Sequence, residues 1–458
     1  MAVRGLRWLA AVALLGAMLS SGGGGALASV APVDQTGVIN GAAYKIEIPA
    51  NWNGDLVLYS HGYVVPGSAN PPTDVGDKLT GAYLMGHGYA LAGSAYRTTG
   101  WSVHEALEDQ IALLNFFDDT FGKPKRTFAW GHSLGGMITA GLVQRHPRRF
   151  DGALPMCGVV AGGVGVWNVA LDAEFVFKTL LAPGSNLQLV NITDPSANLS
   201  LAEGILAQAQ ATPQGRARIA LAAAVGDLPG WFSASSPEPA ANDFVTREAN
   251  QFAWDSQVDF PFVFDFRAEL EGRAGGNASW NTDVNYRHQL DISVGKDEVS
   301  ALYATAGLSL DQDLSTLAHA ARIGADQRAV RYLTRNIVFD GDIGDTPELT
   351  LHTTGDGLVL NQDEQAYASI VDDRRQLLRQ AFVHRAGHCS FTPAETIAAF
   401  NALVHRVDTG RWAGVDPADL NSAATALGPD FNVAPAAYLP FKPTRFPRPF
   451  ALGDDPGN

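Results

Sequence analysis

Two cysteines stand in 458 residues, too few for a disulfide-rich scaffold or for a zinc site held by four thiolates. Only 17% of the residues are charged, and 32 bases face 47 acids. With no basic stripe, the chain is not expected to bind a nucleic acid. The 48 glycines follow no three-residue period, which excludes collagen. The low charge and an ordinary aromatic content of 9% exclude disorder over most of the chain.

The one long apolar run lies at the N-terminus. Residues 1–28 have the parts of a secretory signal: the basic Arg4 and Arg7, an apolar stretch over 8–19, and a cleavage site near Ala28. That stretch is shorter than the roughly 20 residues that a membrane-spanning helix needs. We therefore expect a secreted protein, extracellular or periplasmic, with no stable membrane insertion. An uncleaved membrane anchor is the alternative.

Strand-like and helix-like segments alternate on both sides of a long interruption. Apolar strands are expected at 55–60, 89–95, 127–130, 151–157, 349–353 and 380–384, with helices between them. This rhythm is typical of an α/β fold with a mostly parallel central sheet. Between the fourth and fifth strands the rhythm lapses, and helical stretches over 201–225 and 301–333 take its place.

The lapse in rhythm predicts one α/β domain in two halves, 29–165 and 336–412. A large, mainly helical cap is inserted between them at 166–335, before the strand expected at 349–353. The last segment, 413–458, holds eight of the 25 prolines. We expect it to pack on the surface in extended form.

A Gly-x-Ser-x-Gly pattern at 131–135 suggests a nucleophile. The bare pattern is weak in a chain so rich in glycine, and an ordinary glycine-rich turn is the alternative. A strand before it and a helix after it strengthen the case, because a nucleophilic serine sits on such a strained turn. Ser133 is the predicted nucleophile, with the main-chain N–H of Leu134 beside it.

The run Gly-His-Ser-Leu-Gly-Gly at 131–136 resembles the nucleophile elbow of the α/β-hydrolase superfamily, in its lipase and esterase form. The resemblance covers about 45–165 and 345–406. It implies the chain order serine, acid, histidine, so the partners of Ser133 lie downstream. It also implies that no metal or organic cofactor is needed.

Asp356 is the predicted acid. It follows the strand that ends at Thr353, in a tight turn with a glycine on each side. An ordinary Asp-Gly turn is the alternative. The competing acids are Asp340, Asp342, Asp345 and Asp363. The first three precede the strand, and Asp363 is better placed to cap the next helix.

His388 is the predicted base. It lies in a loop between the last strand and a helix, where an imidazole can reach both partners. His384 lies within or at the end of the strand and is the alternative. His405 is near the end of an amphipathic helix, typical of a surface residue.

Two main-chain N–H groups should stabilise an oxyanion, and Leu134 supplies one of them. The loop His61-Gly62-Tyr63 after an early strand resembles the superfamily's His-Gly turn. Tyr63 is the preferred second donor and Gly62 the alternative.

Cys157 and Cys389 are expected to form a disulfide. Cys157 follows a strand that ends at the active edge of the sheet, and Cys389 is adjacent to His388, which must reach that edge. An exported chain meets an oxidising compartment. The His388-Cys389 pair also resembles half of an arrangement in tannases and fungal feruloyl esterases, although His132 stands where they have the other cysteine. Two free buried thiols are the alternative.

Six aromatic residues crowd into residues 252–266 of the expected cap: Phe252, Trp254, Phe260, Phe262, Phe264 and Phe266. They line either a substrate pocket or the cap's own core. A cap restricts access to Ser133, so a small-molecule or single-chain substrate is expected.

The predicted reaction is the two-step hydrolysis of a carboxylic ester through an acyl-enzyme. An amidase or peptidase with the same triad is the first alternative. A non-catalytic exported binding protein on the same fold is the second. The sequence leaves the oligomeric state open.

Overall fold

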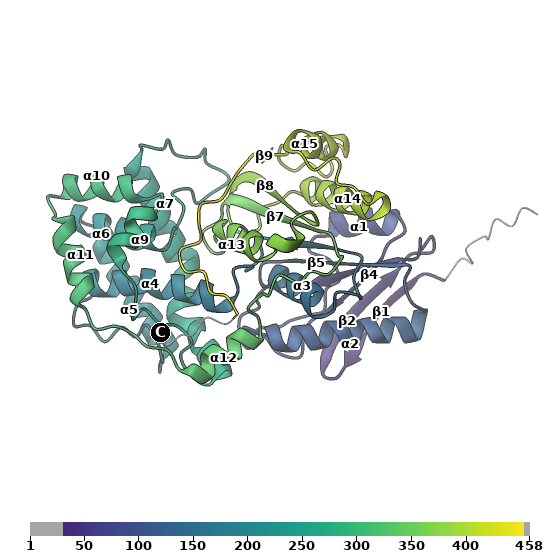
Figure 1. Cartoon of the computed structure of the whole chain (residues 1–458), viewed down its shortest axis with the longest axis horizontal. Helices are drawn as coiled ribbons and strands as arrows, with labels where there is room; N and C mark the ends of the chain where they lie inside the picture. Colours follow the sequence, from purple (N-terminus) through teal and green to yellow (C-terminus); the bar gives the residue numbers. More distant parts are fainter. Residues whose placement is uncertain (1–30, 453–458) are drawn as a thin grey trace, which may run out of the picture.

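Nine strands of residues 31–452, the part of the chain that the computed structural model describes, form one sheet (Figure 1). The strands are β1 (Val33–Ile39), β2 (Ala42–Ile48), β3 (Asp55–Ser60), β4 (Ala90–Ser94), β5 (Arg126–His132), β6 (Gly152–Met156), β7 (Glu348–Gly355), β8 (Leu378–Ala386) and β9 (Tyr438–Leu439). Their order is β1-β2-β4-β3-β5-β6-β7-β8-β9. Strands β3 to β8 pair in parallel, while β1, β2 and β9 pair antiparallel at the edges.

The central strands are buried on both faces, as parallel sheets require. Helices α2 (Val103–Phe121) and α3 (Leu134–Arg145), with α13 (Gln362–Ile370), share one hydrophobic core with the sheet. The other face is covered by α1 (Lys78–Gly86), α14 (Pro393–Thr409) and α15 (Pro417–Ala426). The predicted α/β fold with a mostly parallel sheet is confirmed.

Every secondary-structure element between β6 and β7 is a helix, and these helices stand beside the sheet (Figure 1). Its helices are α4 (Gly163–Leu181), α5 (Pro195–Gln210), α6 (Pro213–Val225), α7 (Phe244–Trp254), the π-helices η1 (Asp255–Asp259) and η2 (Phe262–Phe266), α8 (Arg267–Ala274), α9 (Tyr286–Ile292), α10 (Lys296–Ala306), α11 (Leu310–His319) and α12 (Gln327–Arg335). A short 3₁₀-helix, η3 (Asp372–Arg374), precedes β8. We call α4 to α12 the helical unit. The helical stretches expected at 201–225 and 301–333 are broken into separate helices, the first at Pro213.

The helical unit has a hydrophobic core of its own, distinct from the two cores on the faces of the sheet. Helix α4 joins the two regions, because Trp167 near its start packs in the core of the sheet and Phe175 further along packs in that of the helices. The seam between sheet and helices therefore runs beside α4.

The order of the strands defines where a ligand can enter. From β3 the chain crosses to β4 on one side, whereas from β5 it crosses to β6 on the other. The loops that leave β3 and β5 therefore diverge, and in open α/β sheets a ligand binds in the crevice at this switch point, beyond the carboxyl ends of the strands. Ser133 and Tyr63 both lie in these two loops.

The C-terminal segment differs in part from the extended surface segment that the prolines predict. It contains α15 and the edge strand β9, and its end then crosses from the sheet to the helical unit (Figure 1). There Phe446 is buried, and the Arg448 guanidinium donates to the Asp172 carboxylate at 2.7 Å. The Phe450 ring packs against Trp280. These side chains attach the stretch after β9, which has neither helix nor strand, to the helical unit.

No helix among residues 31–452 is long and apolar enough to cross a membrane. The signal expected at residues 1–28 lies outside the described residues.

The Arg448–Asp172 pair provides a test of this attachment. Asp172 is 1% exposed and also accepts from the Tyr286 hydroxyl, so Arg448→Ala leaves a buried carboxylate without its cation. We expect the free energy of unfolding, measured in urea, to fall by about 3 to 5 kcal/mol. The exposed Arg445 is the matched control, and its change to alanine should cost less than about 0.5 kcal/mol. Equal losses for the two variants would contradict the attachment.

Candidate active site

Ser133 lies between the end of β5 and the start of α3, with φ at +59°. A residue with a Cβ rarely adopts this left-handed conformation. The turn is possible because its two glycines let the main chains approach closely. A Cβ on Gly131 or on Gly135 would collide with the Ser60 carbonyl oxygen of β3. The glycines of the motif are therefore required by packing, as a strained nucleophile elbow needs.

Asp356 and His388 are in direct contact. Nδ1 of His388 donates to Oδ2 of Asp356 at 2.8 Å, and the aspartate is 1% exposed at the end of β7. The other carboxylate oxygen accepts from the main-chain N–H groups of Leu358 and Val359, both at 3.1 Å. Both oxygens are thus held, and the imidazole presents Nε2 as its proton acceptor.

The imidazole's Nε2 lies 3.4 Å from Sγ of Cys389. Among the described residues, Ser133 Oγ makes no hydrogen bond to the His388 ring. Such contacts are often long in substrate-free enzymes and shorten in the complex. His384, the alternative base, is exposed on β8, 3.4 Å from Glu238. The exposed His405 lies on α14.

Cys157 and Cys389 form a disulfide with Cα atoms 5.4 Å apart. Cys157 follows β6, the neighbour of β5 in the sheet, and Cys389 follows His388. Both half-cystines have positive φ, +43° and +53°. The bridge therefore attaches the histidine loop to the edge of the sheet beside the elbow.

The loop after β3 lies against Ser133. A Cβ on Gly62 would come within 3.2 Å of the Ser133 Cβ. Nδ1 of His61 donates to the Gly62 carbonyl at 2.7 Å, and burial lowers the pKa of His61, so the ring is neutral. Because the peptide is planar and trans, this bond directs the Tyr63 N–H to the opposite side. In the described part of the chain, neither that N–H nor the Leu134 N–H donates to a protein acceptor.

His132, which precedes the nucleophile, is held in a neutral state. Burial, with a smaller contribution from the nearby His388, lowers its pKa to about 4. Its Nδ1 lies 3.3 Å from the Tyr59 hydroxyl. His132 therefore adds bulk and a hydrogen-bonding group beside the elbow, but no positive charge at neutral pH.

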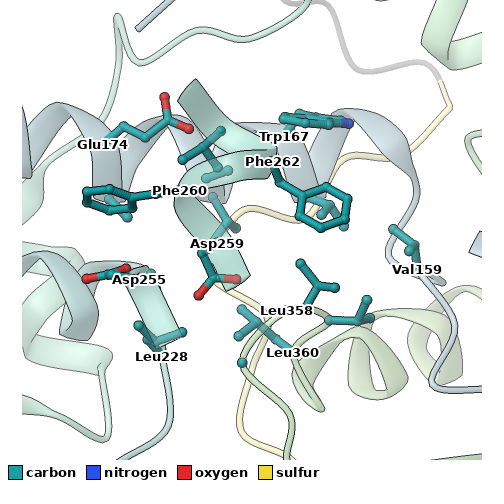
Figure 2. A pocket seen from close by; sticks show the side chains of 18 of the residues that line it. Val159, Trp167, Glu174, Leu228, Asp255, Asp259, Phe260, Phe262, Leu358 and Leu360 are labelled. Carbon is teal, nitrogen blue, oxygen red and sulfur yellow. The ribbon is translucent and has the colours of Figure 1, made fainter. Parts of the chain in front are cut away.

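A cavity of about 160 Å³ extends from Ser133 along the seam between sheet and helical unit. Its lining is mostly apolar and aromatic, as in small-molecule sites. The aromatic residues of 252–266 divide between the two expected roles. Phe262 lines the cavity and packs on Tyr63 at 5.1 Å, whereas Phe264 is buried in the core of the helices, and Phe260 does both (Figure 2).

Four carboxyl side chains in the cavity wall were not predicted as site residues: Glu174, Asp255, Asp259 and Asp363. The expectation that Asp363 caps a helix is wrong. Asn361 occupies the N-cap of α13, and the Asp363 carboxylate accepts from the Ala161 N–H at 3.4 Å. Asp255 and Asp259 stand four residues apart within the aromatic segment, which is the one signal the sequence offers.

Burial changes the protonation of these acids. It raises the pKa of Asp255 to about 8, with a further contribution from Glu248. It raises the pKa of Asp259 well above its usual range, and the charges of Asp255 and Asp356 add to the effect. Both groups therefore hold protons at neutral pH.

Several known proteins are similar to this chain in sequence or in structure. Residues 82–163 match the prolyl oligopeptidase family. The o-phthalyl amidase of Xanthobacter agilis is 30% identical over 425 residues, which are 84% of this chain and 90% of the relative. Two solved esterases of Aspergillus oryzae, one of them feruloyl esterase B, are 14% identical with TM-scores of 0.40; the alignments cover 81% and 83% of this chain and 77% and 80% of theirs.

The disulfide can be tested chemically. Denatured, unreduced protein should show no free thiol, because Cys157 and Cys389 are the chain's two cysteines. In the chain-entropy model a loop this long stabilises by up to about 5 kcal/mol, and strain reduces the gain. Reduction should therefore lower the unfolding temperature and should lower activity before the fold is lost. Two free thiols per unreduced chain would contradict the bridge.

The protonation of Asp255 predicts a pH-dependent stability. Its pKa is about 8 when folded, above the unfolded value of about 3.9, so the folded state keeps a proton that the unfolded state releases. This group's contribution is fully present below pH 4 and is lost as the pH rises toward 8. Asparagine cannot release a proton, so the Asp255→Asn variant does not lose this stability as the pH rises. Its free energy of unfolding in urea, relative to that of wild type, should therefore be higher at pH 8 than at pH 5. Asp283 is exposed, so Asp283→Asn is the control and should show no such pH dependence. An equal effect of Asp255→Asn on the free energy of unfolding at both pH values would refute the prediction.

Proposed function

The chain belongs to the same family as o-phthalyl amidase, among the serine hydrolases of the α/β-hydrolase superfamily, and from this we propose that it cleaves carboxylic amides and esters at Ser133. The observation that carries the proposal is the 2.8 Å bond between His388 and a buried Asp356, near a strained serine. These are the parts of a Ser-His-Asp triad.

In the proposed first step, Ser133 Oγ attacks the carbonyl carbon while its proton passes to Nε2 of His388. Asp356 fixes the ring and stabilises the imidazolium that forms. The proton then passes to the departing amine or alcohol, which leaves an acyl group on Ser133. Water, deprotonated by the same imidazole, attacks this ester, and collapse of the intermediate releases the acid and returns the proton to Ser133.

The negative oxygen of each tetrahedral intermediate needs two donors. We assign them to the N–H groups of Leu134 and Tyr63. The first lies at the N-terminus of α3, where the helix dipole favours a negative charge. The second is directed by the bond from His61 to the Gly62 carbonyl.

Ester and amide cleavage use the same catalytic groups, so the preference between them is inferred from the relative, o-phthalyl amidase. A whole-length relative named as an amidase favours amides, and the aromatic lining of the cavity favours an aromatic acyl group. The disulfide and the signal-like residues 1–28 support a protein exported to an oxidising compartment.

The assignment of Ser133 is tested with a fluorophosphonate probe and with matched p-nitrophenyl esters and p-nitroanilides. Wild type should be labelled and should release nitrophenol or nitroaniline. Ser133→Ala should lose labelling and about 10³- to 10⁶-fold of turnover while it stays folded by circular dichroism. His388→Ala should lose a comparable factor. His384→Ala is its matched control and should keep most of the activity, because His384 is exposed on β8 and its ring lies beside Glu238. Near-normal turnover by Ser133→Ala would refute the assignment, and no labelling of folded wild type would favour a binding protein.

A further inference from the structure

The C-terminal segment supplies part of the wall of the cavity in the candidate active site. We call residues 440–452 the strap; after β9 it crosses from the sheet to the helical unit (Figure 1). On this path Phe446 is 1% exposed and lines the cavity. Its ring packs in a small apolar cluster with Ala161, Val169 and Leu360 (Leu360 in Figure 2). Part of the wall is therefore an aromatic side chain that belongs neither to the sheet nor to the helical unit.

The strap is attached on both sides of the cavity. The Phe446 N–H donates to Oε1 of Gln365 on α13, which packs on the sheet, at 2.8 Å. Two residues later the Arg448 guanidinium pairs with Asp172 on α4. Pro447 stands between these two contacts, and a residue before proline is restricted to extended conformations. The main chain that carries the Phe446 ring is therefore held in place.

The strap and α4 approach each other closely at Gly165. A Cβ on this glycine would lie 3.0 Å from the Arg448 carbonyl oxygen and 3.1 Å from the Phe446 ring, which is tighter than an ordinary contact. Glycine is unfavourable in a helix, so its position in α4 is explained by this approach. Because the ring packs so closely on α4, it has little room to move aside when a ligand enters the cavity.

The cavity is on the acyl side of the reacting carbonyl. In the proposed mechanism His388 protonates the departing amine or alcohol, so that group lies on the side of the imidazole. Ser133 and the oxyanion donors Leu134 and Tyr63 line the cavity, whereas His388 is not among the described residues of its lining. The cavity is therefore placed to receive the acyl group.

The volume of the cavity leaves little space beyond one aromatic ring. A cavity of about 150 Å³ binds benzene, and this one measures about 160 Å³. A longer acyl group would have to displace part of the wall. Such overpacking is unfavourable, because it forces side chains away from their preferred rotamers.

We propose that Phe446 determines the size of the acyl group that the protein accepts, admitting an aryl ring with at most a short substituent. The inference rests on the proposed function, because it places the scissile carbonyl at Ser133. Phe446 acts through its bulk, since a hydrocarbon ring takes no part in proton transfer. A longer acyl group collides with this ring, and its carbonyl then reaches Ser133 only in a strained position.

The test compares p-nitrophenyl esters of benzoic acids that carry a methyl, propyl or pentyl group at the para or the meta position. In wild type, kcat/KM for the pentyl ester should be at least tenfold below that for the methyl ester. Phe446→Ala removes the ring and enlarges the cavity, so this pentyl-to-methyl ratio should rise at least tenfold at one position or both, as one methylene in an apolar pocket is worth about tenfold or more. Phe446→Leu keeps a smaller apolar side chain and should give an intermediate ratio, which provides a second variant should the alanine variant fail to fold.

Phe450→Ala is the matched control. It removes an identical ring from the same strap, where Phe450 packs on Trp280 and is not among the residues that line the cavity, so the wild-type ratio should be kept. The proposal is overturned by a wild-type ratio above one tenth at both positions, by an unchanged ratio in the Phe446 variants that fold, or by an equal change in Phe450→Ala. Labelled wild type that cleaves no ester of the series overturns it as well. Fluorophosphonate labelling would in each case still support the hydrolase, whereas folded wild type that shows neither labelling nor turnover would refute the proposed function itself.

Discussion

The close approach of the β3, β5 and α3 main chains is the constraint on which the rest of the site depends. Gly131 and Gly135 let these chains meet where a side chain would collide with Ser60. That contact holds Ser133 in a conformation it would otherwise avoid. Two neighbouring loops are held beside this turn. The loop after β3 is held by the bond from the His61 ring to the Gly62 carbonyl, and the loop of His388 is held by the Cys157–Cys389 disulfide.

The cavity lies where two hydrophobic cores meet, so its two sides come from different parts of the fold. The sheet carries Ser133, Asp356 and His388 at the ends of its strands, while the helical unit supplies most of the wall. Helix α4 contributes to both cores, and the C-terminal segment is attached to this helix through the Arg448–Asp172 pair. Substrate preference can therefore change through the wall without any change in the reaction, as is common for folds that serve many functions.

Local chemistry was enough to predict the six central strands, β3 to β8, and the placement of Asp356 beside His388, but it did not predict the edge strands β1, β2 and β9. Asp356 stands out because glycines flank it after a strand, and His388 because it follows one. The cavity wall carried no comparable signal. Asp255 and Asp259 have a spacing that also suits a solvent-exposed helix face, and Phe446 reaches the cavity from far along the chain. The role of Asp363 was wrongly predicted because acids near the start of a helix usually cap it.

The disulfide has a topological effect, since its two cysteines are 232 residues apart and enclose the whole helical unit. Residues 157–389 are a covalent ring. A protease that cuts once inside this ring opens it but releases no fragment, because both pieces remain joined through sulfur. A chain nicked between α4 and α12 therefore migrates as one species without reductant and as two with it. The helical unit can thus be cleaved while Asp356 and His388 stay attached to the sheet that carries Ser133.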